Sequence, residues 1–147
     1  MSLKKSLLAA SALALVAAGA AQAQSMSSAG ALAFDDTNTL FVGDAKAGLV
    51  HAFDLSGALV DQADYQLGRA QTFEGRTIFN HLDVEIAALL GIEAADVVIN
   101  DMVVHKPTKQ ILLSIHRGLG PDAEAVIIAV NNGALELIDL DAAEHSS

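Results

Sequence analysis

The polar residues best suited to chemistry lie around one predicted strand pair in the second half of the chain. Asn100 and Asp101 come directly before an apolar run, and His116, Arg117 and Asp122 follow the next one. Antiparallel neighbours run in opposite directions, so the residues entering one strand lie beside those leaving its partner. The sequence therefore predicts a ligand face formed by Asn100, Asp101, His116, Arg117 and Asp122.

Asn100 and Asp101 place an amide and a carboxylate next to each other on this face. Carboxylate and amide oxygens suit Ca²⁺, which takes six to eight oxygen ligands, so two residues supply only part of a coordination sphere. The other interpretation is that Asp101 caps the turn into its strand through its own backbone. We expect no cofactor, with Ca²⁺ at these two residues as the alternative.

Arg117 opens a loop shaped by two glycines and a proline, Gly118-Leu119-Gly120-Pro121-Asp122. A guanidinium binds a carboxylate or phosphate through two parallel hydrogen bonds, which makes Arg117 a candidate ligand contact. The other interpretation is an ion pair within the chain, to Asp122 or Asp101. The sequence has no nucleophile elbow, phosphate-loop lysine, dinucleotide fingerprint or haem motif, so no reaction is predicted, and we lean against enzymatic activity.

Short apolar runs separated by turn residues position this face, and they occur in two similar sets of four. The first set covers 31–34, 39–44, 49–54 and 57–59, and the second covers 102–105, 110–114, 126–130 and 133–135. The pattern predicts a mainly β fold of two four-stranded antiparallel, propeller-like blades. One short α-helix is inserted between the blades.

The insertion, residues 64–98, begins with a loop at 68–75 and continues with the helix. Asn80 is the expected N-cap and Gly91 the expected end of this helix. Its apolar residues recur at helical spacing, at Leu82, Ile86, Leu89 and Leu90. We expect this stripe to pack on the sheets rather than bind a partner.

The first 23 residues have the pattern of a bacterial secretory signal peptide. Lys4 and Lys5 precede an apolar stretch at 7–20, and Ala21-Gln22-Ala23 forms a small-residue cleavage site. A membrane anchor is the alternative, but the firmly apolar part is too short to span a bilayer. The predicted location is periplasmic or secreted, without stable membrane insertion after cleavage.

The chain is acidic and has no cysteine. It carries 18 Asp and Glu against 8 Lys and Arg, and cleavage after Ala23 would remove two lysines and no acid. Such a surface repels polyanions, so nucleic acid is not an expected partner. Disulfides are unavailable, so stability must come from packing or assembly.

The strand pattern resembles that of exported bacterial β-propellers of the NHL and SMP-30 (gluconolactonase)-like kind. The residues that carry this resemblance are 32–35, 39–44 and 50–54 in the first set and 99–104 with 113–123 in the second. The SMP-30 resemblance implies an Asn-Asp metal step at Asn100 and Asp101. It also implies a glutamate where this chain has Phe34 or Asp35, which is a departure from that pattern.

Propellers close with at least four blades, so two blades predict an incomplete propeller. A two-blade N-terminal fragment is favoured over a homo-oligomeric ring or a two-sheet domain. The expected partners are further blades or other copies of the chain that cover the sheet edges. The expected function is a non-catalytic exported binding or interaction module; the alternative is an SMP-30-like divalent-metal-dependent hydrolase acting on a lactone or ester.

The predicted organisation has six segments. They are a signal peptide at 1–23, a flexible segment at 24–30, the first blade at 31–63, the insertion at 64–98, the second blade at 99–140 and a polar tail at 141–147.

Overall fold

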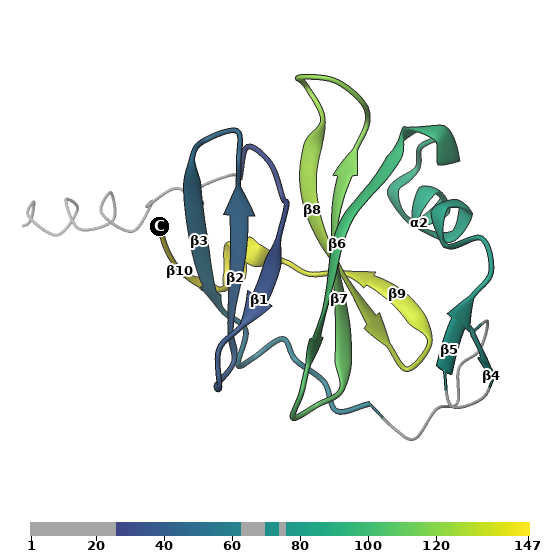
Figure 1. The fold of residues 1–147 in the computed structure, drawn as a ribbon, viewed down its shortest axis with the longest axis horizontal. Helices are drawn as coiled ribbons and strands as arrows, with labels where there is room; N and C mark the ends of the chain where they lie inside the picture. Colours follow the sequence, from purple (N-terminus) through teal and green to yellow (C-terminus); the bar gives the residue numbers. More distant parts are fainter. Residues whose placement is uncertain (1–25, 63–69, 74–75) are drawn as a thin grey trace, which may run out of the picture.

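The computed structural model describes residues 26–62, 70–73 and 76–147, with the side chains of 70–79 left out of the description. The predicted signal peptide lies outside these ranges. Two antiparallel four-stranded sheets stand side by side, and one helix packs at the far side of the second sheet (Figure 1). The predicted mainly β fold of two propeller-like blades with one inserted helix is confirmed, and the sheets do not close into a ring.

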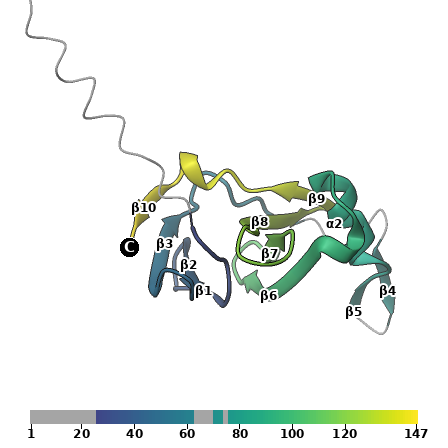
Figure 2. The same cartoon turned by 90° about the horizontal axis from the view of Figure 1, so that it is seen from above.

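The first blade has the strand order β1-β2-β3-β10. Its strands are β1 (Leu32–Phe34), β2 (Thr39–Asp44), β3 (Leu49–Asp54) and β10 (Glu144–Ser146). Side chains alternate between the two faces of a strand, so Leu40 and Val42 enter the core while Phe41 between them faces outward. Viewed from above, the blade lies beside β6 to β8 of the second sheet (Figure 2).

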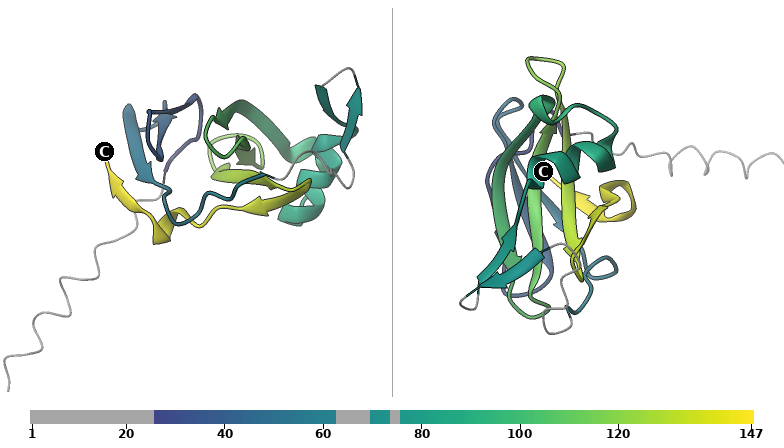
Figure 3. Two further views of the ribbon diagram at one scale, coloured as in Figure 1. Left: turned by 90° about the horizontal axis from the view of Figure 1, so that it is seen from below. Right: turned by 90° about the vertical axis from the view of Figure 1, so that its right-hand side faces the viewer.

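The predicted fourth strand of the first blade, at 57–59, is wrong. The N–H groups of Ala58 and Leu59 both donate to the Leu55 carbonyl, at 2.8 and 3.1 Å, so this segment is a turn. The fourth strand is β10, which lies in the predicted polar tail and pairs antiparallel with β3. Figure 3 shows the C-terminal segment running from the second sheet back to the first. Pairing with the free edge of β3 makes a strand of residues that have no apolar alternation of their own.

The second blade consists of β6 (Val97–His105), β7 (Gln110–Arg117), β8 (Glu124–Asn131) and β9 (Ala134–Leu137), paired in chain order. Its first strand begins at Val97, five residues before the predicted apolar run. A β-bulge interrupts its pairing with β7 between Ile99 and Asp101. Asn100 and Asp101 therefore lie within a strand rather than ahead of one.

The core is divided between the two faces of the second blade. One cluster fills the space between the blades and includes Leu40, Phe53 and Leu112, while the other lies under the helix and includes Leu113 and Ile115. Consecutive residues of β7 thus serve different clusters, as period-two alternation requires. Strand β7 therefore contributes side chains to both clusters of the core.

The insertion contains a hairpin and the helix. Strand β4 (Ala70–Phe73) pairs with β5 (Arg76–Phe79), so the prediction of one continuous loop at 68–75 is wrong over 70–73, and the rest of that loop lies outside the described residues. Helix α2 (Leu82–Leu90) ends at Gly91 as predicted, with φ of 70°. Among the residues described there are also two 3₁₀ turns, η2 (Ala94–Asp96) and η3 (Leu140–Ala142).

The predicted N-cap of α2 is wrong. The cap position is His81 in the left-handed conformation, with φ of 60°, and its side chain makes no capping hydrogen bond. The chain turns sharply at His81, which moves Asn80 out of the cap position. No helix in the part of the chain described is both long and apolar enough to cross a membrane.

Helix α2 offers a matched pair of substitutions that tests the packing. Ile86 is fully buried against β7 and β8, whereas Leu89 is 38% exposed. We expect Ile86→Ala to lower the free energy of unfolding by about 2–4 kcal/mol, because it removes a buried side chain and leaves a cavity. Leu89→Ala should cost less than about 1 kcal/mol. Urea denaturation measures both, and equal costs would contradict the observed packing.

Candidate functional site: the seam and the cleft between the blades

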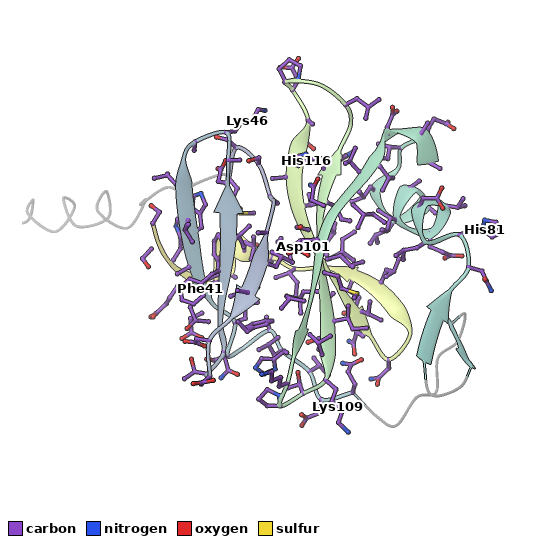
Figure 4. All side chains as sticks on the ribbon, in the orientation of Figure 1. Phe41, Lys46, His81, Asp101, Lys109 and His116 are labelled. Carbon is purple, nitrogen blue, oxygen red and sulfur yellow. The ribbon has the colours of Figure 1, made fainter. Side chains whose placement is uncertain are left out.

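Four side chains of β6 and β7 bind the backbone of residues 29–32 of the first blade. Asn100 Nδ2 donates to the Ala29 carbonyl at 2.8 Å, and Ser114 Oγ donates to the Gly30 carbonyl at 2.7 Å. Asp101 Oδ2 accepts from the Leu32 N–H at 2.8 Å, and His116 Nε2 accepts from the Ala29 N–H at 3.1 Å. We call these four side chains the interblade seam; Figure 4 places Asp101 and His116 between the two sheets.

The β-bulge explains how two consecutive residues reach the same neighbour. In a regular strand the side chains of Asn100 and Asp101 would point to opposite faces. A bulge sets two residues of one strand against one residue of its partner and re-aims the side chains. The pairing register shifts by one residue between Ile99 and Asp101, and both polar side chains bind the first blade.

The structure brings together three of the five predicted ligand-face residues. Asn100, Asp101 and His116 meet in the seam, although their contacts are to the backbone of the neighbouring blade. Arg117 lies at the end of β7, and its Nη1 is 3.3 Å from Glu124 Oε2. This cross-strand ion pair replaces the predicted partners Asp122 and Asp101, because β8 begins directly opposite Arg117.

Both oxygens of Asp101 are engaged. Oδ1 accepts from the Met102 N–H at 2.8 Å, and Oδ2 accepts from Leu32 as described above. The first of these bonds matches the interpretation in which Asp101 caps its own backbone. Among the residues described, no group of three or more His, Cys, Asp or Glu side chains is arranged to hold a metal ion.

Buried polar side chains also join the blades at the end that carries the β6–β7 turn. His105 Nε2 is 3.1 Å from the Thr37 carbonyl, and its Nδ1 is 2.7 Å from Thr108 Oγ1. Gln110 Oε1 accepts from the Val60 N–H at 2.9 Å. The contacts between the blades therefore extend over most of the height of the sheets.

Asp44, His51 and His145 form a third polar group, inside the first blade, which the sequence did not predict. His51 Nε2 lies 3.3 Å from Asp44 Oδ2, and His51 Nδ1 lies 2.9 Å from His145 Nε2. Burial alone would raise the pKa of Asp44, but donors from Ala47, Ser28, Ser27 and His51 hold it well below its usual value. Burial, with a smaller effect of His51, lowers the pKa of His145.

Asp122 lies apart from the seam, on the rim of a cleft of about 720 Å³ between the blades. Leu137 and Leu140 contribute apolar surface that solvent reaches, and the lining also includes Phe53 and Ile127, which are only 2% and 1% exposed. The acidic residues of the lining are Asp122, Glu124, Asp139 and Asp141. Lys46 also lines the cleft, and its Nζ donates to the Pro121 carbonyl, which connects the β2–β3 turn to the loop after β7.

Comparison with protein-family models, with curated proteins and with solved structures finds no match for this chain. The fold and the site define a pair of propeller-like blades that are joined by a polar seam and have a cleft between them.

Removal of the Asp101 carboxylate tests the seam. In Asp101→Ala the N–H groups of Leu32 and Met102 lose their acceptor, and we expect the free energy of unfolding to fall by about 2–3 kcal/mol. Asp122→Ala is the matched control, because Asp122 is exposed on the cleft rim, and it should change stability by less than about 0.5 kcal/mol. Urea denaturation gives both values. A cost for Asp101→Ala as small as that of the control would contradict the seam.

The occupied oxygens of Asp101 also lead to an expectation about calcium. Because both oxygens already accept backbone N–H groups, we expect millimolar Ca²⁺ to shift the melting temperature by no more than about 1 °C. Differential scanning fluorimetry with and without the ion makes the measurement, and Mg²⁺ is the control. A larger Ca²⁺-specific rise that disappears in Asp101→Asn would contradict this expectation and support the metal interpretation.

Proposed function

We propose that this chain is an exported, non-catalytic interaction module of the β-propeller type that binds a partner in the interblade cleft. The observation that carries the proposal is the cleft itself, whose apolar walls come from both blades and whose rim is acidic. Concave sites of this size with apolar walls and a few polar groups are the usual form of binding sites. The secretory pattern of residues 1–23 supports the exported location.

The chemistry of the cleft favours a basic, amphipathic peptide segment. An apolar anchor side chain would replace water against Leu137 and Leu140, and lysine or arginine side chains would face the carboxylates of Asp122 and Asp141. The net charge of −10 would attract such a partner over a longer range. The seam keeps the two walls at a fixed spacing, which limits the ordering cost of binding.

The outer faces of the two blades suggest a second kind of contact. Phe41 and Val50 are exposed on the first blade, and Ile99, Met102 and Val104 are exposed on β6 of the second. Helix α2 covers the part of the second blade around Leu113 and Ile115. In a propeller each blade packs on its neighbours, so we propose that further propeller blades or a second copy of the chain cover these exposed side chains.

Binding of a designed peptide tests the proposed function. We expect a fluorescein-labelled peptide of alternating Leu and Lys to bind more tightly than its Leu and Glu counterpart, in fluorescence anisotropy at low salt. Asp122→Asn combined with Asp141→Asn should weaken binding of the Lys peptide by about fivefold, the effect of two rim charges. Asp36→Asn is the control, because Asp36 is an exposed acid in the β1–β2 turn and does not line this cleft.

Two results would contradict the proposal. One is equal affinity for the Lys and Glu peptides, and the other is equal loss of affinity in the cleft variant and in Asp36→Asn. Either would show that the acidic rim does not select the partner.

A further inference from the structure

The strand that completes the first blade is short, and one side chain fixes it to the sheet. β10 pairs with β3 over three residues, Glu144 to Ser146. Its middle residue, His145, stacks on Phe53 with ring centroids 4.6 Å apart and lies 2.9 Å from His51 Nδ1. His51 is 2% exposed, so this contact is closed off from solvent on the side of the sheet.

The position of Asp44 determines where the protons lie. Asp44 remains ionised, and a carboxylate only accepts hydrogen bonds, so the facing His51 Nε2 carries a proton. In neutral His51 the other ring nitrogen, Nδ1, is then an acceptor, and His145 Nε2 donates to it. A proton added to Nδ1 of His145 leaves this bond intact. A second proton, on His51 Nδ1, sets N–H against N–H and places two positive rings at the same contact.

We propose that His51 and His145 form an acid-sensitive clasp that holds β10 on β3 at neutral pH and releases it when both rings are protonated. The clasp does not depend on what the interblade cleft binds. Release of β10 would also alter the cleft. The 3₁₀ turn η3 lies directly before β10, and its residues Leu140 and Asp141 line that cleft.

The direction of the pH effect follows from linkage. The pKa of His145 is lower in the docked strand than in a free chain, so the released strand binds protons more tightly. The clasp is therefore fully formed above the ordinary histidine pKa of about 6.5 and weakens as the pH falls below it. Each additional proton bound on release raises the released population by about tenfold per pH unit.

Other charged groups near the clasp act in known directions. The carboxylate of Asp44 faces His51 and attracts positive charge to that ring, which receives the second of the two protons, so Asp44 favours release. Glu144 and Asp54 lie opposite each other across the two strands, where like charges repel at neutral pH. Side-chain and backbone hydrogen bonds from Ser56 hold the pKa of Asp54 below its usual value, so Asp54 stays ionised over the range in which His145 gains a proton.

Two-dimensional ¹⁵N NMR of the full chain between pH 7.5 and 4.5 tests the clasp. In the wild type we expect the amide shifts of 144–146 to move from strand to coil values as the pH falls, while those of β7 stay unchanged. His145→Gln keeps a side-chain donor and His145→Phe keeps a ring on Phe53, and neither titrates. In whichever variant forms β10 at pH 7.5, the strand should persist to pH 4.5.

His81→Asn is the control, because it removes an exposed histidine at a left-handed position that asparagine tolerates. This variant should release β10 at the same pH as the wild type. The proposal is overturned if the wild-type strand shifts persist to pH 4.5. It is also overturned if a His145 variant that forms β10 loses the strand at the wild-type pH.

Discussion

The structure depends on hydrogen bonds to the backbone N–H and carbonyl groups of one edge segment, residues 29–32. Residues 29–32 form the inner edge of the first blade, and on one side of this edge the Gly30 N–H and the Ala31 carbonyl bond to Gly43 of β2. Its remaining donors and acceptors would be unpaired, which is costly in a partly buried position and leaves an open sheet edge. The interblade seam binds them with side chains rather than with another strand. This arrangement fixes the spacing of the two sheets, and the shared apolar cluster and the cleft both depend on that spacing.

The C-terminal segment adds a second link between the blades. After β9 the chain crosses back through η3, and β10 completes the sheet of the first blade. Figure 2 shows this crossing segment running along one side of the two sheets, so it joins the blades in addition to the seam. The segment that crosses also lines the cleft, so strand pairing in the first blade and the shape of the proposed binding site involve the same few residues.

The sequence predicted those parts of the fold that local patterns determine. Apolar alternation located β2, β3, β7 and β8, and helical spacing with Gly91 located α2 and its end. The elements that the sequence did not predict form through pairing with residues far away in the chain. Glu144, His145 and Ser146 have no strand pattern, and they become a strand because the edge of β3 is free. At the site, strand direction predicted that Asn100, Asp101 and His116 meet, but no local signal showed that their partner is the backbone 69 to 87 residues away. The meeting of His51 with His145, separated by 94 residues, was invisible for the same reason.

The side chains of the interblade seam join the two blades, and amide hydrogen exchange at Leu32 tests this most directly. The Leu32 N–H has Asp101 as its acceptor, at 2.8 Å. We predict that this amide is protected from exchange in the wild type and that Asp101→Ala removes its protection while the amides of β7 and β8 keep theirs. Fast exchange of Leu32 in the wild type, or unchanged protection in Asp101→Ala, would contradict the account.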